Sequence, residues 1–271
     1  MIKYGRIWIM SIEVKKLIQK KRRQKYFILF IQIASVLLFL FLWEFLSNHK
    51  IINPFIFSSP SNIWKTLKDL YLSNGLFEHI FTTLYEIVIA FSIGISLGFM
   101  ISIILYEIPL LYKIVDPFLT MLNSLPKVAL GPMIIIWAGA NTKAIIIMAL
   151  LINLIVSILN IYNGFDNIDE TKLKLFKTFK ASRMQTFLYL ILPASFKSVI
   201  ASLKINISMT LIGVIMGEFL VSKKGIGYLI IYGTQVFNLN LVMSGIVLLI
   251  ILSFILYEFI SFIEKKLSQN R

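Results

Sequence analysis

Residues 84–106 read LYEIVIAFSIGISLGFMISIILY, and Glu86 is the one charged residue among them. As an α-helix this stretch would be about 35 Å long at 1.5 Å per residue. The hydrocarbon core of a bilayer is about 30 Å thick, and about 20 consecutive apolar residues cross it as a helix. In water the same helix would have no polar face to present to solvent. The stretch therefore predicts a transmembrane helix.

Five other apolar runs predict five more spans, so we expect an all-α integral membrane fold. The six predicted spans are residues 27–46, 84–106, 117–140, 144–162, 205–221 and 241–263. The 271-residue chain is 58% hydrophobic and 15% charged, whereas soluble domains are about 45–50% apolar and about 25% charged. The first run follows a basic leader, as a signal peptide would. It is too long for one and no small-residue cleavage site follows it, so we expect it to be retained.

The positive charges predict the orientation of the spans. The formal net charge is +14, from 27 Lys and Arg against 13 Asp and Glu. With the N-terminus inside, the cytosolic segments carry 21 of the 27 cations; these segments are residues 1–26, 107–127, 163–204 and 264–271. Cytosolic loops are rich in Lys and Arg. We therefore expect a multi-pass protein of the plasma (cell inner) membrane with both termini in the cytosol, and we do not expect nucleic-acid binding.

The sequence offers little for cofactor chemistry or catalysis. It has no Cys, and its two histidines, His49 and His79, lack a third metal ligand at a useful spacing. A Gly-x4-Gly-Lys-Ser/Thr phosphate loop is missing, and Gly225-Ile226-Gly227 lacks the third glycine of a dinucleotide fingerprint. We expect these glycines to shape a turn in an external re-entrant segment. We also expect no bound cofactor, no metal and no catalytic residues.

Small residues recur at four-residue spacing on two spans. They are Ala90, Gly94, Gly98 and Ser102 on the second span, and Gly213 and Gly217 on the fifth. Such faces let helix backbones approach closely in lipid. The pattern favours a tight helix bundle or a homodimer interface over chance.

The third predicted span contains Pro126, Gly131 and Pro132 near its cytosolic boundary. Each proline removes a backbone donor and obstructs the preceding turn. Transporters use broken helices near their pathways, but prolines also end helices. The sequence leaves both interpretations open.

The acidic residues of the predicted spans bear on whether an ion gradient drives transport. Five glutamates lie near span ends, where we expect their side chains to reach the interface: Glu44, Glu86, Glu218, Glu258 and Glu264. No span has an ionisable residue at its centre, which is where an ion-driven carrier would need one. A stand-alone ion-coupled carrier or channel is therefore the alternative rather than the favoured function.

The longest predicted cytosolic loop, residues 163–204, contains two short helical patterns. Asp169 and Glu170 are suited to a helix start. Lysines interleaved with apolar residues follow, and a second helix is expected from about Ser182 to Leu192, broken by Pro193. Such a pair could dock into a groove of a partner protein or lie on anionic lipid, and the physical pattern alone favours lipid.

The same loop resembles the cytoplasmic EAA loop of binding-protein-dependent ABC transporter permeases. That pattern reads Glu-Ala-Ala, three residues, Gly, nine residues, Ile-x-Leu-Pro. The spacing, Ala181-Ser182-Arg183 and the final Leu192-Pro193 are kept, but Lys174-Leu175-Phe176 replaces Glu-Ala-Ala and Lys180 replaces Gly. If the glycine position is left-handed, a lysine there costs about 1–2 kcal/mol.

The resemblance extends over roughly residues 57–264 and is specific to the nitrate/sulfonate/taurine-type subfamily. The residues that carry the resemblance are Ser58-Ser59-Pro60-Ser61 before Trp64, Asp116-Pro117, the run from Ser124 to Pro132, Ile136-Trp137-Ala138-Gly139, and Glu218 followed by Gly225-Ile226-Gly227-Tyr228.

This resemblance implies the permease subunit of a type I ABC importer, which forms the path for a solute such as nitrate, a sulfonate, taurine or a pyrimidine vitamin precursor. The implied partners are a second permease copy, two ATPase subunits that bind ATP and Mg²⁺, an extracytoplasmic solute-binding protein and membrane lipid. The implied ATPase-docking residues are Lys174, Leu175, Phe176, Lys177, Phe179, Lys180, Arg183, Leu192 and Pro193.

Overall fold

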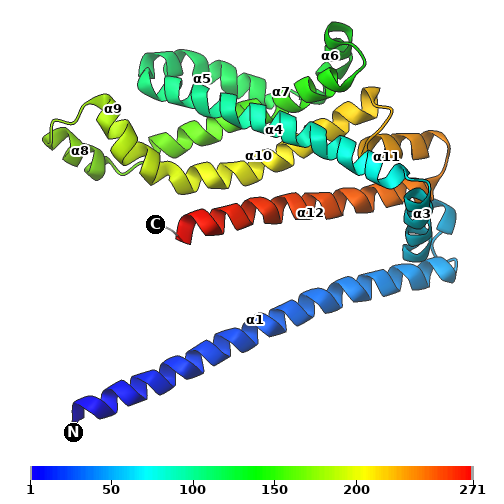
Figure 1. Ribbon diagram of the computed structural model, residues 1–271, viewed down its shortest axis with the longest axis horizontal. Coiled ribbons are helices and arrows are strands. Elements are labelled where there is room, and N and C mark those ends of the chain that lie inside the picture. Colours follow the sequence, from blue (N-terminus) through cyan, green and yellow to red (C-terminus); the bar gives the residue numbers. More distant parts are fainter. Residues whose placement is uncertain (1, 270–271) are drawn as a thin grey trace. The chain divides into compact units, whose positions relative to one another are not determined.

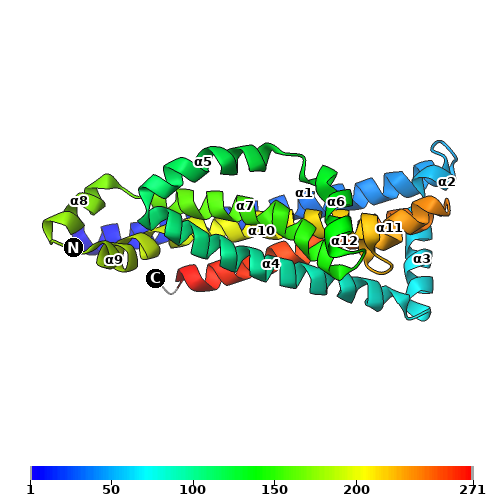
Figure 2. The same ribbon diagram turned by 90° about the horizontal axis from the view of Figure 1, so that it is seen from above.

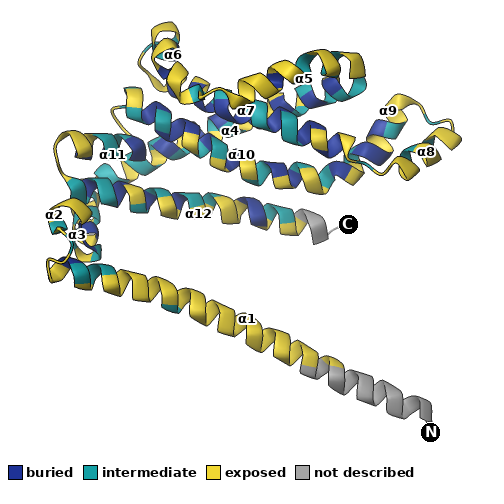
Figure 3. Cartoon of the chain, turned by 180° about the vertical axis from the view of Figure 1, so that it is seen from behind, coloured by how far each residue is buried: buried dark blue, intermediate teal, exposed yellow. Residues whose placement is uncertain are grey.

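The computed structural model describes residues 2–269. The chain forms two compact units, with the boundary between Lys65 and Thr66. The first unit contains α1 (Ile2–Asn48), α2 (Pro54–Phe57) and the beginning of α3 (Pro60–Leu72) (Figure 1). Within α1, the side chains in the most apolar part of the stretch Leu17–Asn48 are exposed (Figure 3). Apolar side chains exposed all round a helix are typical of a span that faces lipid.

The turn after α1 is fixed by polar side chains. Glu44 accepts hydrogen bonds from the backbone N–H of Ser61, at 3.0 Å, and from its hydroxyl, at 2.8 Å. The buried hydroxyl of Ser47 donates to the carbonyl of Ser58 at 3.0 Å. These bonds hold the start of α3 against the end of α1, so Glu44 has a structural role in this turn.

The second unit is a bundle of long helices built around α7. The helix α7 (Thr142–Asp166) packs along both α4 (Gly75–Glu107) and α10 (Leu192–Val221). The helix α12 (Leu239–Gln269) packs on α10 and on α11 (Ile226–Gln235), and α5 (Pro109–Ser124) packs on α4 and α7 (Figures 1 and 2). The buried faces of α4, α7 and α10 meet in the interior of this unit (Figure 3).

The repeated glycines lie where these helices approach most closely. The backbone of Gly94 faces the side chain of Asn153, and that of Gly98 faces Ser157. A Cβ built on Gly213 would lie 2.5 Å from the Cα of Ala149, and one on Gly217 would lie 2.9 Å from the Cα of Ile145. The side chain of Ala90 is also completely buried. The structure thus places the small-residue faces at the α4–α7 and α7–α10 contacts within one chain.

The third predicted span is broken at its prolines. The helix α5 ends at Ser124, a short 3₁₀ turn, η1, covers Lys127–Leu130, and α6 covers Gly131–Ala138. The two arms differ in direction by 85°. Five of the described helices are long and apolar enough to cross a membrane, and the bent pair makes a sixth if it is counted as one span.

The prediction that Pro193 breaks the second short helix of the loop is wrong. The helix α9 (Arg183–Thr186) continues through a π-helical turn, η2 (Phe187–Ile191), directly into α10. The N–H of Leu192 bonds to the carbonyl of Phe187, five residues earlier, so the hydrogen-bond register has already shifted before the proline. Pro193 stands in the first turn of α10, where a missing N–H costs nothing.

Candidate docking site at one end of the bundle

A helix–turn–helix knob projects from one end of the bundle, formed by α8 (Glu170–Thr178), α9 and the turn between them (Figure 1). The start of α8 is capped as the sequence predicts, because the Asp169 carboxylate accepts a hydrogen bond from the N–H of Thr171 at 2.8 Å. This bond lowers the pKa of Asp169 from its ordinary value. Glu170 and Lys174 form an ion pair at 3.2 Å one turn apart. Lys174 is therefore engaged on the surface of α8 itself.

The end of α8 has a Schellman motif with lysine at the glycine position. The N–H of Ala181 bonds to the carbonyl of Phe176 at 3.1 Å, and the N–H of Lys180 bonds to the carbonyl of Lys177 at 2.9 Å. Lys180 has a φ of 53°, in the left-handed region. Glycine is the usual residue at this position of the motif. The structure thus has a left-handed turn at the position where the EAA pattern has glycine, although this chain has a lysine there.

A capping box starts α9 immediately after this turn. The N–H of Gln185 bonds to the Ser182 hydroxyl at 3.2 Å, and the N–H of Ser182 bonds to the Gln185 side chain at 2.8 Å. The reciprocal bonds satisfy two backbone donors that the start of the helix would otherwise leave free. Together with the Schellman motif they fix the angle between α8 and α9.

The outer side of the knob is apolar and exposed. Leu175 is 52% exposed and Phe179 is 73% exposed, and the two lie one turn apart. Phe176 is only half-buried, whereas Pro193 is exposed and Leu192 half-buried at the start of α10. Of the predicted docking residues, Leu175 and Phe179 therefore form the apolar pair that faces outward.

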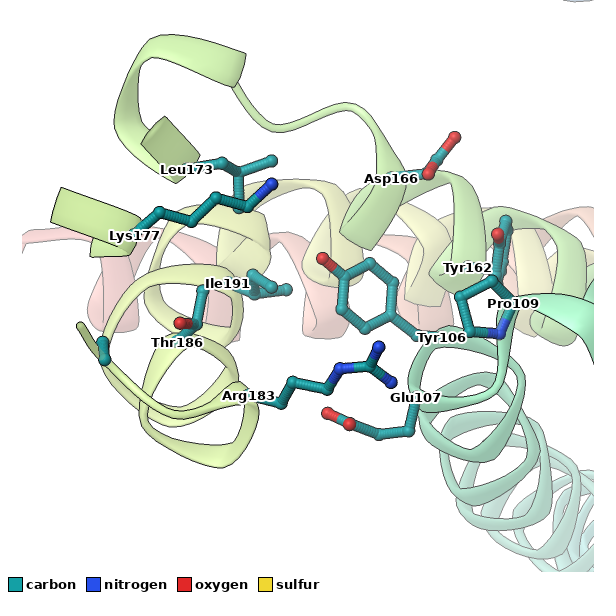
Figure 4. Close-up of a pocket in the computed structure, with 11 residues that line it drawn as sticks. Tyr106, Glu107, Pro109, Tyr162, Asp166, Leu173, Lys177, Arg183, Thr186 and Ile191 are labelled. Atoms are coloured by element: carbon teal, nitrogen blue, oxygen red, sulfur yellow. The ribbon is translucent and has the colours of Figure 1, made fainter. Parts of the chain in front are cut away.

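The inner side of the knob closes a cavity of about 450 Å³ against the ends of α4 and α7. Lys177 and Arg183 line it from the knob, and Glu107 and Asp166 line it from the bundle (Figure 4). Figure 4 shows the side chains of Lys177 and Arg183 directed into this space. Of the four predicted docking cations, Arg183 thus lies beside the carboxylate of Glu107 in the same chain, and Lys177 lines the same cavity.

Aromatic packing attaches the knob to the bundle. Phe187 of η2 is buried against Phe165 of α7, with ring centroids 5.5 Å apart in an edge-to-face arrangement. Tyr106 of α4 lies 6.0 Å from the same Phe187 ring. Ile161 and Ile191 complete this cluster. A displacement of the knob would therefore act directly on α4, α7 and α10.

At the opposite end of the bundle, the expectation that Glu86 and Glu218 reach the interface is wrong. Glu86 is 1% exposed and Glu218 is 0% exposed, and their carboxyl groups contact each other. Sequence reasoning treated each acid separately, near the end of its own helix. The available signal was Gly225 and Gly227, which follow Glu218 closely and leave room for its carboxyl group beneath the turn.

Comparisons with known proteins identify the family to which the chain is similar. The profile of the family described as "Binding-protein-dependent transport system inner membrane component" matches residues 90–269. The putative aliphatic sulfonates transport permease of Bacillus subtilis (strain 168) is 25% identical over 230 residues, covering 85% of this chain and 83% of the relative. The formylaminopyrimidine transport permease of Halalkalibacterium halodurans is 28% identical over 193 residues, covering 71% and 76%. The taurine transport system permease of Escherichia coli (strain K12) is 19% identical over 243 residues, covering 88% of each chain.

The fold also matches a solved transporter structure. A chain of the inward-facing MetNI methionine ABC transporter superposes with a TM-score of 0.62 at 17% identity, covering 72% of this chain and 97% of that chain. At this identity the similarity concerns the fold alone.

Proposed function

The chain belongs to the binding-protein-dependent transport system inner membrane components and is a permease subunit of an ABC importer, and on this basis we propose that the α8–α9 knob receives the work of ATP hydrolysis from a separate ATPase subunit. The observation that carries the proposal is the pair of outward apolar side chains, Leu175 and Phe179, on a knob whose turn is fixed at both ends. An exposed apolar pair of this kind fits a groove of a partner protein.

Transmission through the knob is supported by its inner contacts. The helix α9 continues through η2 into α10, and Phe187 packs on α7 beside Tyr106 of α4. A partner that pushes on the knob would move three long helices at once. In the proposed cycle, closure of the ATPase dimer on ATP reorients these helices and opens the path alternately to the two sides.

The proposed assembly has two copies of this permease in the lipid membrane, two ATPase subunits on the cytosolic side and a solute-binding protein on the extracytoplasmic side. ATP and Mg²⁺ bind to the ATPase, and this chain carries out no chemical reaction. We place the knob and both termini in the cytosol, which the distribution of Lys and Arg supports.

The proposed substrate is a small organic solute of the kinds that the relatives' names state, namely a sulfonate, taurine or a formylaminopyrimidine, or a related anion such as nitrate. Membership of the family supports the class of transporter, and it does not select one of these solutes. Uptake measured with each of them in turn would select among them.

The experiment that tests the docking proposal compares Leu175→Ala and Phe179→Ala with Lys172→Ala, an exposed substitution on α8 outside the predicted docking set. Truncating an anchor side chain at the centre of an interface commonly costs about 2 kcal/mol or more, which is roughly a thirtyfold loss of affinity. We expect the first two variants to reach the membrane, to lose co-purified ATPase and to lose uptake, while Lys172→Ala retains both. Uptake that is unchanged in all three, or transport by the purified chain alone in proteoliposomes, would contradict the proposal.

A further inference from the structure

Two acidic side chains meet in the interior of the bundle, at the end opposite the knob. Glu86 belongs to α4 and Glu218 to α10, and both are almost completely buried. Two carboxylates in contact repel each other, so both cannot be ionised there without a compensating positive charge. A buried charge without a partner costs several kcal/mol.

Three hydrogen-bond donors surround the carboxyl group of Glu218. Its Oε1 accepts a hydrogen bond from the hydroxyl of Thr83 at 2.6 Å, and its Oε2 accepts one from the N–H of Gly227 at 2.5 Å. The backbone of Tyr228 also bonds to this carboxylate. Three donors directed at one carboxyl group stabilise its negative charge.

The surroundings of Glu86 do not offer such donors. Among the described residues, neither oxygen of its carboxyl group receives a hydrogen bond from an N–H or O–H group. Its carboxyl group contacts that of Glu218. Glu86 therefore needs either a proton of its own or a bound cation.

The charged and titratable side chains nearby are committed elsewhere or lie at the surface. Lys224 forms an ion pair with Glu78. The Nδ1 atom of His79 accepts a hydrogen bond from the N–H of Gly225 at 3.0 Å, and the His79 ring stacks on that of Tyr228.

The two remaining lysines, Lys223 after α10 and Lys143 on α7, are exposed. In the part of the chain that the structure describes, no ion pair joins a cationic side chain to Glu86 or Glu218.

A cleft of about 330 Å³ leads to Glu86. It lies between α4, the start of α7 and the turn after α10, and Asn141, Thr142 and Ile145 form part of its wall. Exposed Lys223 and Lys224 stand at its rim. The proposed orientation places this end outside, so an external cation would reach the pair through the cleft.

We propose that Glu86 and Glu218 form a cation-binding site that holds a proton or a metal ion between their carboxyl groups. The bound charge fastens α4 to α10 and to the start of α11. The hydroxyl of Thr83 donates to Glu218 and accepts from the N–H of Ile226 at 2.8 Å, so the same site holds the first residue of α11. Loss of the charge would loosen this end of the bundle.

The test compares the full-length wild-type chain in lipid nanodiscs with Glu86→Gln and with the control Asp69→Asn, which changes an exposed acid on α3. The amide of Gln can donate to Glu218 without any bound cation. We expect the thermal midpoint of the wild type to fall by about 4 °C or more when the pH is raised in metal-free buffer. Asp69→Asn should respond in the same way, and Glu86→Gln should not respond.

Restoration of the wild-type midpoint by Mg²⁺ or Ca²⁺ at high pH would identify a metal ion as the ligand, and restoration by acid alone would identify a proton. If the wild type and Glu86→Gln respond identically to pH and to metal, the proposal is wrong.

An infrared spectrum of the wild type at neutral pH gives a second test that needs no folded variant. A protonated-carboxyl band, or carboxylate bands that shift with added metal, would support the site, and the lack of both would overturn it.

Discussion

Replacing Lys180 by glycine should make the knob more stable. Lys180 adopts a φ of 53° in the Schellman motif that ends α8. A residue with a Cβ pays about 1–2 kcal/mol for this left-handed conformation. Glycine also has more freedom in the opened chain, which offsets about 0.5–1 kcal/mol of the gain. The net stabilisation expected for Lys180→Gly is therefore about 0.5–1 kcal/mol.

Amide hydrogen exchange of the intact chain in nanodiscs measures this local gain. The informative amide is that of Ala181, because its N–H closes the motif on the carbonyl of Phe176. Local opening free energies determine protection, and 0.5–1 kcal/mol corresponds to about a two- to fivefold slower exchange.

A matched substitution of the same residue type reverses the expected sign. Lys172 lies inside α8 with helical backbone, where a glycine is less favourable than other residues by up to about 1 kcal/mol. Lys172→Gly should therefore speed exchange across α8. Exchange at Ala181 that is unchanged or faster in Lys180→Gly would refute the argument that the lysine is strained.

Two further predictions concern helix packing and the cap of α8. Gly213→Ala should destabilise the bundle by about 1–3 kcal/mol, because the new Cβ would lie 2.5 Å from the Cα of Ala149. The control Gly75→Ala should leave the thermal midpoint unchanged, because its new Cβ meets nothing closer than 3.6 Å. Equal thermal midpoints for the two variants would contradict the packing argument. The Thr171 amide resonance should titrate at a pH below the ordinary Asp range, because the Thr171 N–H lowers the pKa of Asp169. The hydrogen bond of the cap is present above the ordinary Asp pKa and is lost as the pH falls through the lowered pKa. Titration at or above the ordinary Asp pKa would show that the cap does not form.

Local patterns predicted the spans and the start of the knob. Apolar runs identified the membrane helices because the bilayer requires about 20 apolar residues from any helix that crosses it. Hydropathy could not give the full lengths: α1 begins at Ile2 rather than at residue 27, because its polar turns carry no hydropathy signal. Asp169 marked the start of α8 because capping depends on the neighbouring few residues alone.

The features that prediction missed depend on contacts between distant parts of the chain. Glu86 and Glu218 are far apart in sequence, and each looked like an acid close enough to a helix end to reach water. Their burial follows from the close packing of α4 and α10 and from the turn at Gly225. The resemblance implied Arg183 as an ATPase-docking residue, and the position of its side chain in the cavity beside Glu107 depends on how the knob packs on α4 and α7.

One helix connects the two sites at opposite ends of the bundle. The knob continues through η2 into α10, and α10 carries Glu218 in its last turns before ending at Val221. A helix of 30 residues is about 45 Å long and bends little along its length. A displacement of the knob by the ATPase would therefore reach the Glu86–Glu218 contact as a rigid movement of α10 against α4. Conversely, the charge held between the two carboxyl groups would set the free energy needed to separate these helices. In the proposed mechanism, occupancy of the cation site and engagement of the ATPase thus act on the same helix pair, and each should change the response to the other.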